Sequence, residues 1–275
     1  MLGKLIKHEF KETYKTFLLL YVAILFLSVV NLGFNELGDG TNGLMMIVEV
    51  LFMIAFVLCA FFLSTISLVL IVIRFYKNLL GDEGYLMHTL PVKKSSLIIS
   101  KWIVAAVWTV CSIVMVILSI FILVGREVPW GKMFDFIGKV YNGYDGMMTL
   151  TIVGFLCIMI SVMSQLMLIY ASMAVGQIWQ KHRVLGAFLS FFAINMATQT
   201  VTSQITAVFM ASNAEKLNNK FEHIVATNAG FIDGLTSIGD FLTAYLSLSA
   251  ILLLAFCVLY FFICNYFMTN RLNLE

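Results

Sequence analysis

Charged residues are scarce in this chain, and their scarcity decides its class. Asp, Glu, Lys and Arg make up only 12% of the 275 residues, whereas 61% are apolar. Ordinary soluble domains carry about 25% charged and roughly 45–50% apolar residues. The composition therefore excludes a water-soluble globule. It also excludes a disordered chain, because disorder requires a low apolar content.

The sequence also lacks a charge imbalance and paired cysteines. Fifteen acidic residues oppose 17 basic ones, so the net charge is only +2 and no broad basic surface is left for nucleic acid. The five cysteines lie inside apolar runs, with no CxxC pair and no histidines at ligand spacing. This pattern argues against a disulfide framework and against a zinc site.

Catalytic motifs are missing as well. Neither HExxH nor GxSxG occurs, and the four histidines all lie outside the apolar runs. An acid and a histidine are therefore not expected to meet inside a membrane, as an intramembrane hydrolase would require. We expect a non-catalytic chain that binds no metal and no cofactor of its own.

What the chain does contain is long apolar runs. A helix needs about 20 mostly apolar residues to cross a hydrocarbon core of roughly 30 Å. Six runs reach that length, at 17–34, 44–73, 102–124, 148–176, 187–210 and 241–268. The only two prolines, Pro91 and Pro129, lie between runs. The sequence predicts an all-α membrane protein with six transmembrane helices in one domain, 1–275.

The basic residues indicate the orientation of these helices. Twelve of the 17 Lys and Arg residues lie before the first run, in the loop 74–101, at 181–183 or after the last run, and five lie in the alternate segments. Lys and Arg are enriched on the cytoplasmic side of membranes. We therefore expect both the N and C termini in the cytoplasm.

The leader, 1–16, has an amphipathic pattern. Leu2, Ile6 and Phe10 follow one another at helical spacing, and four lysines gather on another face. This pattern predicts an interfacial helix with its apolar face in the membrane lipids and its lysines toward anionic headgroups. A plain membrane anchor is the alternative.

The loop between the second and third runs contains four apolar residues after an acidic pair. An apolar patch rimmed by charge suggests docking to another protein, and a tight turn against the inner ends of the spans is the alternative. The residues of this candidate docking segment are Gly81, Asp82, Glu83, Gly84, Tyr85, Leu86, Met87, His88, Leu90 and Pro91.

Polar residues inside the predicted spans form the second candidate site. Polar side chains in hydrocarbon are costly, so they tend to face other helices or water. They could line a transport path or a dimer interface, or make ordinary interhelical hydrogen bonds, and an acidic side chain could also reach the outer interface. The candidates are Glu49, Gln165, Asn195, Gln199, Thr202 and Thr206.

The order of an interfacial leader, six spans with both ends inside and a structured inner loop resembles the permease subunits of the type-2 ABC exporter superfamily. The segments 5–11 and 78–91 are similar to those of permeases from Firmicute-type bacteria. The resemblance implies a coupling helix between spans two and three that docks on an ATPase. It also implies that the second and fifth spans border the pathway.

This resemblance sets the functional expectation. The chain would be the membrane-spanning part of an ATP-driven exporter in a bacterial cell membrane, moving an amphipathic or hydrophobic cargo such as a peptide or lipid by alternating access. The implied partners are two ABC ATPase subunits, which would bind ATP and Mg, and a second permease of the same or a related kind. The alternative is an ATP-independent secondary transporter or the substrate-binding subunit of a vitamin-uptake system.

Overall fold

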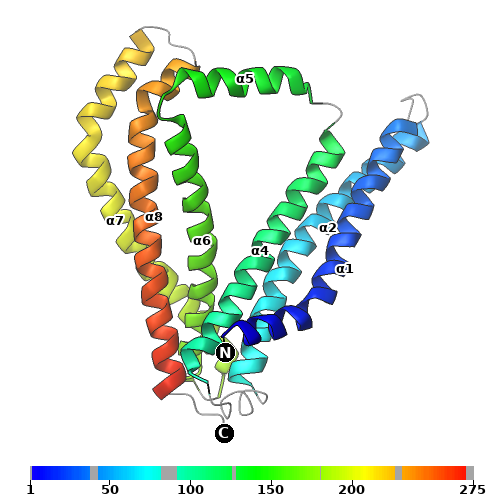
Figure 1. Ribbon diagram of the computed structural model, residues 1–275, viewed down its shortest axis with the longest axis vertical. Coiled ribbons are helices and arrows are strands. Elements are labelled where there is room, and N and C mark those ends of the chain that lie inside the picture. The colour runs from blue at the N-terminus through cyan, green and yellow to red at the C-terminus, as the bar shows by residue number, and fades with distance from the viewer. Residues whose placement is uncertain are drawn as a thin grey trace. The chain divides into compact units, whose positions relative to one another are not determined.

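The computed structural model of the protein describes residues 2–37, 43–81, 92–125, 128–179, 181–226 and 231–270 (Figure 1). All regular structure within these ranges is helical. Six long helices each contain a stretch long and apolar enough to cross a membrane, which confirms the predicted number of spans. They are α1 (Leu2–Leu37), α2 (Gly43–Phe75), α4 (Lys94–Val124), α6 (Met147–Gly176), α7 (Arg183–Ala226) and α8 (Phe231–Asn270).

Two shorter elements complete the described structure. A π-helical turn, η1 (Tyr76–Leu80), continues directly from α2, and the helix α5 (Trp130–Gly143) precedes α6. The leader and the first predicted span are joined in the single helix α1, which bends after its first turns (Figure 1). No proline or glycine lies between residues 4 and 32, so nothing in the backbone ends the helix there.

The chain divides into two compact units. The first lies within Met1–Pro129 and contains α1, α2 and α4. Its apolar core gathers Ile24 of α1, Phe56 and Leu63 of α2, and Leu123 of α4, all buried. Each helix of this unit therefore contributes to one shared core.

Hydrogen bonds cross the same three helices. The Tyr21 hydroxyl of α1 lies 3.0 Å from Ser112 Oγ of α4, which lies 3.2 Å from Ser67 Oγ of α2. Farther along α1, Asn31 Nδ2 donates to the Phe52 carbonyl of α2 at 3.0 Å. These bonds satisfy polar groups that lipid could not satisfy.

The second unit, Trp130–Leu272, contains α5, α6, α7 and α8. Helix α6 packs along α8, where Cys157 Sγ lies 3.3 Å from Ser249 Oγ. Phe209 of α7 stacks on Phe241 of α8 with ring centroids 5.6 Å apart. Helix α7 extends to Ala226, well past the predicted end of its apolar run at 210.

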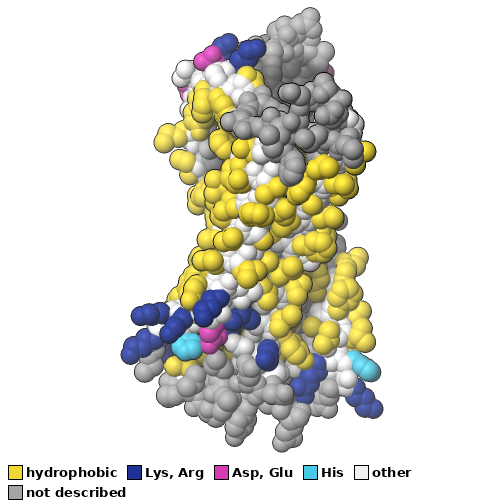
Figure 2. Space-filling model, turned by 90° about the vertical axis from the view of Figure 1, so that its right-hand side faces the viewer, with side chains coloured by type: hydrophobic (Ala, Val, Ile, Leu, Met, Phe, Trp, Pro, Cys, Tyr) yellow, Lys and Arg dark blue, Asp and Glu magenta, His cyan; other side chains and the backbone are white. Residues whose placement is uncertain are grey.

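The membrane-spanning helices expose large apolar side chains. Examples are Leu19 and Phe26 of α1 and Phe61 of α2, which are 69%, 67% and 64% exposed. Figure 2 shows hydrophobic side chains across the middle of the face it presents, with Lys and Arg gathered at the end that carries the first turns of α1. Apolar side chains at this density suit contact with lipid and not with water.

A tyrosine joins the segment between α5 and α6 to α8. The Tyr144 hydroxyl donates to Asp240 Oδ1 at 2.9 Å. Desolvation, reinforced by the Asp240 carboxylate, raises the pKa of Tyr144 above its ordinary value, so the phenol keeps its proton at neutral pH. The ring fills a slot between two glycines: a Cβ on Gly146 would lie 2.3 Å from the Tyr144 oxygen, and one on Gly239 2.5 Å from Cζ.

We expect Gly239→Ala to displace the Tyr144 ring and to break its hydrogen bond to Asp240, because the new methyl group would occupy the position of the ring. Ultraviolet titration of the tyrosines checks this: one tyrosine should titrate at a lower pH in the variant. Gly138→Ala in α5, where a Cβ meets nothing within 4 Å, is the matched control. Identical titration curves for the two variants would show that the Tyr144 ring does not fill the space between these glycines.

Candidate functional site: a charge cluster beside the predicted docking segment

The first turns of α1 are fixed against α4 by a line of buried residues. Glu9, Thr13 and Phe17, spaced by four, are exposed by only 9%, 4% and 1%. Phe17 stacks on Trp108 of α4 with ring centroids 4.5 Å apart and planes 7° from parallel. Trp108 Nε1 donates to Thr13 Oγ1 at 2.8 Å, and Thr13 donates to the Glu9 carbonyl at 2.8 Å. This part of α1 is therefore packed against protein on one face.

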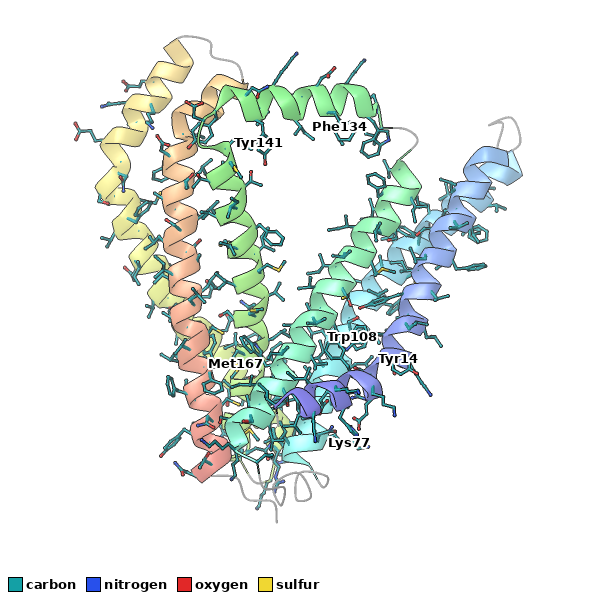
Figure 3. The ribbon with its side chains drawn as sticks, in the orientation of Figure 1. Tyr14, Lys77, Trp108, Phe134, Tyr141 and Met167 are labelled. Carbon is teal, nitrogen blue, oxygen red and sulfur yellow. The ribbon has the colours of Figure 1, made fainter. Side chains whose placement is uncertain are left out.

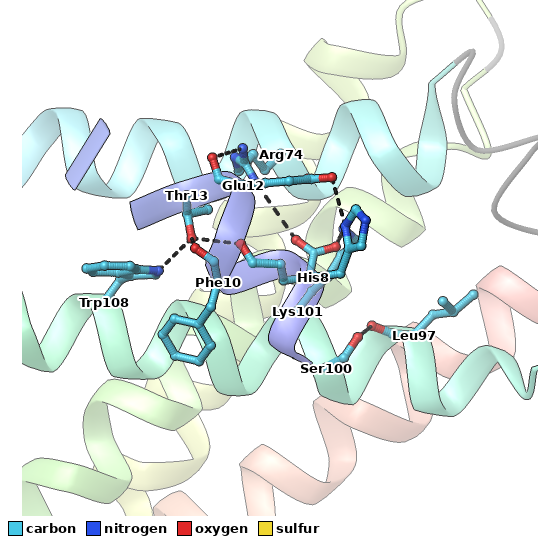
Figure 4. Close-up of polar contacts among 10 residues, drawn as sticks. His8, Phe10, Glu12, Thr13, Arg74, Leu97, Ser100, Lys101 and Trp108 are labelled. Atoms are coloured by element: carbon cyan, nitrogen blue, oxygen red, sulfur yellow. Dashed lines mark hydrogen bonds and ion pairs between the residues drawn. The ribbon is translucent and has the colours of Figure 1, made fainter. Parts of the chain in front are cut away.

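A carboxylate at the end of that line binds cations from two other helices (Figure 4). Glu9 Oε1 forms an ion pair with Lys101 of α4, which is only 5% exposed. Glu9 Oε2 lies 3.9 Å from Arg74 Nη1 of α2. Arg74 also pairs with Glu12 Oε2 at 3.4 Å and donates to the Glu12 carbonyl at 3.0 Å. We call Glu9, Glu12, Arg74 and Lys101 the Glu9 cluster.

The charges of the Glu9 cluster balance, since two carboxylates face two cations. A buried ion pair recovers its desolvation cost only when both partners are present and well placed. His8, whose Nδ1 lies 3.0 Å from Glu12 Oε1, is on the exposed side of the cluster. Among the described residues no group of His, Cys, Asp and Glu could hold a metal ion. The balanced charges of the cluster therefore suit it to joining helices.

Two members of the Glu9 cluster flank, along the chain, the segment that the sequence predicts as a docking site. Arg74 is the next-to-last residue of α2, and Lys101 lies about two turns into α4. The turn η1 after α2 buries Leu79 and Leu80, and the Gly81 N–H closes it by donating to the carbonyl of its first residue, Tyr76, at 2.8 Å. Glu9 thus connects the helix that enters this segment with the helix that leaves it.

Of the predicted docking residues, Gly81 alone falls within the described ranges. It lies half-buried at the end of η1 in an extended conformation. The other members lie outside the described residues: Asp82, Glu83, Gly84, Tyr85, Leu86, Met87, His88, Leu90 and Pro91. Their role stays a prediction.

The polar candidates within the spans are distributed over different faces. Glu49 lies in α2, with its side chain outside the described part, and Gln165 is exposed on α6. On α7, Asn195, Thr202 and Thr206 are half-buried, whereas Gln199 is exposed. Thr198, which lies beside these residues on α7, hydrogen-bonds with Tyr260 of α8. Asn195, Thr202 and Thr206 are therefore partly covered by other residues, whereas Gln199 is open.

The exposed face of α7 differs from that of the other spans. It carries small and polar residues in mid-helix, and Gln199 and Gln204 have no hydrogen-bond partner within the described chain. The exposed faces of α2 and α8 carry mainly Leu, Ile, Val and Phe, although α2 also exposes Ser64 and Thr65, and α7 itself also exposes Met196 and Val208. The small or polar residues of this α7 face are Ala193, Ala197, Gln199, Thr200, Ser203, Gln204 and Ala207. A face of this kind is poorly matched to lipid.

Sequence reasoning missed the Glu9 cluster. It assigned Lys101 to the loop 74–101, but the structure places this residue inside α4, which begins at Lys94. It gave Glu9 no role in the leader. The available signal was the spacing of Glu9 and Thr13 with the apolar Phe17, which puts an acid on the apolar side of the helix.

The fold and the composition define the class of protein: this is a multi-pass helical membrane protein. Comparison with protein-family models, with curated proteins and with solved structures found no match to the chain.

Proposed function

We propose that this chain is the membrane-spanning subunit of an ATP-driven exporter of the type-2 ABC class, in the cell membrane of a bacterium. Two separate ATPase subunits would bind ATP and Mg and would dock on the segment 81–91. A second permease, a copy of this chain or a related one, would complete the pathway. With few ionisable side chains in the spans, an amphipathic or hydrophobic cargo such as a peptide or lipid fits this chain best.

The observation that carries this proposal is the position of Glu9. Its carboxylate pairs with Lys101 of α4 and lies 3.9 Å from Arg74 of α2, so it connects both helices that flank 82–91. A segment that receives motion from an ATPase has to be joined stiffly to the helices that it moves. The two helices and the first turns of α1 would then shift as one rigid body and open the pathway by alternating access.

The exposed face of α7 supports the proposal that this chain pairs with a second permease. Thr200 and Ser203 satisfy their hydroxyls by donating to carbonyls of their own helix, but the amides of Gln199 and Gln204 have no hydrogen-bond partner among the residues that the structure describes. Pairing with another permease would supply hydrogen bonds and would let the alanines approach a facing helix closely.

Co-purification tests the proposal. The full chain is expressed with the ATPase that the proposal expects a neighbouring reading frame to encode, and is compared with a variant carrying Tyr85→Ser, Leu86→Ser and Leu90→Ser. We expect the native pair to elute together with ATPase activity, and the triple variant to lose at least tenfold in bound ATPase, equivalent to about 1.4 kcal/mol. The yield of the permease should not change.

A control variant with Val184→Ser and Leu185→Ser removes exposed apolar residues from the first turn of α7, 71% and 56% exposed, and should retain the ATPase. If the triple variant binds the ATPase as well as the native chain does, the docking assignment is wrong. Transport by the purified chain alone in vesicles would instead establish an ATP-independent carrier.

A further inference from the structure

Helix α5 has an apolar face that the second unit leaves open. Phe134, Ile137 and Tyr141 follow one another at spacings of three and four, and they are 64%, 41% and 44% exposed. They therefore share one side of the helix. The polar side of the same helix carries Lys132, Asp135, Lys139 and Asn142, all exposed.

Helix α5 is attached at its C-terminal end. Val140 is buried, and the Tyr141 hydroxyl donates to Thr151 Oγ1 of α6 at 3.1 Å. The bond from Tyr144 to Asp240 fixes the following turn to α8. The helix lies across the ends of α6 and α8 and not along them (Figure 1), and its N-terminal turns project beyond them.

The direction of the apolar face follows from Figure 3. Phe134 and Tyr141 point from α5 toward the side on which α6 runs, and not away from it. Helix α6 is a candidate span that begins at Met147, only four residues after the end of α5 at Gly143. Helix α5 therefore lies at the end at which the candidate span α6 begins, with its apolar side turned toward the side along which that span runs.

We propose that α5 is a lipid-binding helix that lies in the lipid–water boundary, with Phe134, Ile137 and Tyr141 among acyl chains and its lysines at the level of the lipid phosphates. Aromatic rings are favoured at this depth, and an amphipathic helix gains most there by burying its apolar side only. The Tyr141 hydroxyl keeps a hydrogen bond, which an aromatic side chain at a boundary requires.

The continuity of the surface favours lipid over a protein partner. At the start of α6, the residues Met148, Ile152 and Phe155 are 67%, 50% and 61% exposed. They form an exposed apolar face at the start of the candidate span that directly follows α5. A lipid layer covers such a bent surface without any matching shape, whereas a protein partner would need one.

Spin labels on the two sides of α5 test the proposal in the full-length chain. Ile137→Cys on the apolar side and Lys139→Cys on the polar side are labelled with a nitroxide, and the proteins are reconstituted in vesicles of phosphatidylcholine and phosphatidylglycerol. Collisions with oxygen, which dissolves in acyl chains, are compared with collisions with a water-soluble nickel chelate. The unaltered chain, with its five native cysteines, gives the labelling background.

We expect the ratio of oxygen to nickel collisions to be at least fivefold higher at 137 than at 139. A label at Phe134→Cys should give a collision ratio like that at 137, and a label at Asp135→Cys a ratio like that at 139. Equal ratios on the two sides would show α5 to be solvated and would overturn the proposal. Positions 134 and 137 inaccessible to both reagents would overturn it too, because a protein would then cover the apolar side.

Discussion

Lys101→Met is expected to lower the free energy of unfolding by about 3 kcal/mol, because it leaves a buried carboxylate without its closest cation. Lys101 is 5% exposed and its partner Glu9 9% exposed, so water cannot replace the lost charge. The expected loss is at the lower end of the range for broken buried pairs, since Arg74 remains 3.9 Å from the same carboxylate. In a chain of this size the loss corresponds to a decrease of about 6–12 °C in melting temperature.

The measurement is the rate at which a fluorescent thiol reagent reaches the native cysteines as the detergent-solubilised protein is heated. Cys257 and Cys264 are buried and react only after unfolding. Lys11→Met, at an exposed position of α1, is the matched control. A double variant with Glu9→Leu and Lys101→Met should regain most of the lost stability, because it removes both buried charges. The pairing argument fails if Lys101→Met melts at the same temperature as Lys11→Met.

The double variant also separates stability from function. If the Glu9 cluster transmits motion from the ATPase, the double variant should melt near the native temperature and still show uncoupled ATPase activity. If the cluster only stabilises the fold, recovery of the melting temperature should restore coupling as well.

Gly176→Ala is expected to destabilise the second unit by about 3 kcal/mol or more. A Cβ on Gly176 would lie 2.3 Å from the backbone nitrogen and 2.5 Å from the Cα of Ala187, far inside the roughly 3.5–4.0 Å of a favourable contact. Both of these atoms belong to backbone, so no side-chain rotation relieves the overlap. Gly186 is also closely approached from the other side, since its Cβ would lie 2.8 Å from the Gly176 carbonyl oxygen.

Gly154→Ala in the same helix is the control, with an expected change of opposite sign. Its Cβ would lie 3.9 Å from Leu246 Cδ1, an ordinary contact, and alanine is favoured over glycine within a helix by about 0.8–1.0 kcal/mol. Thermal unfolding and the yield of monodisperse protein measure both variants. A melting temperature for Gly176→Ala equal to or above that of Gly154→Ala would disprove the close crossing of α6 and α7.

The spans were predictable because they depend on local composition alone. Each is an apolar run long enough to cross a bilayer, and each predicted run is contained in one helix or nearly so. The ends were less predictable, since helices continue through polar sequence without a breaker. Residues 211–226 contain no glycine or proline, and α7 therefore extends to Ala226.

The candidate sites depend on contacts between distant residues, which composition does not encode. Glu9 and Lys101 are 92 positions apart, and each alone has the pattern of an ordinary interfacial charge. The polar residues Asn195, Gln199, Thr202 and Thr206 of α7 were visible in the sequence. The direction in which they face was not, because both sides of that helix carry polar residues. The role of Gly176 likewise depends on a partner helix that passes within van der Waals distance.

The bonds along α1 occur at uneven intervals, with Glu9, Thr13, Tyr21 and Asn31 each held by another helix. Sliding α1 lengthwise by a single residue would break its bonds to α4 and its bond to α2 together. In a medium without water none of these polar groups could replace its lost bond with one to solvent. The helices α1, α2 and α4 therefore resist shear, and any conformational change in this protein has to hinge outside that three-helix block.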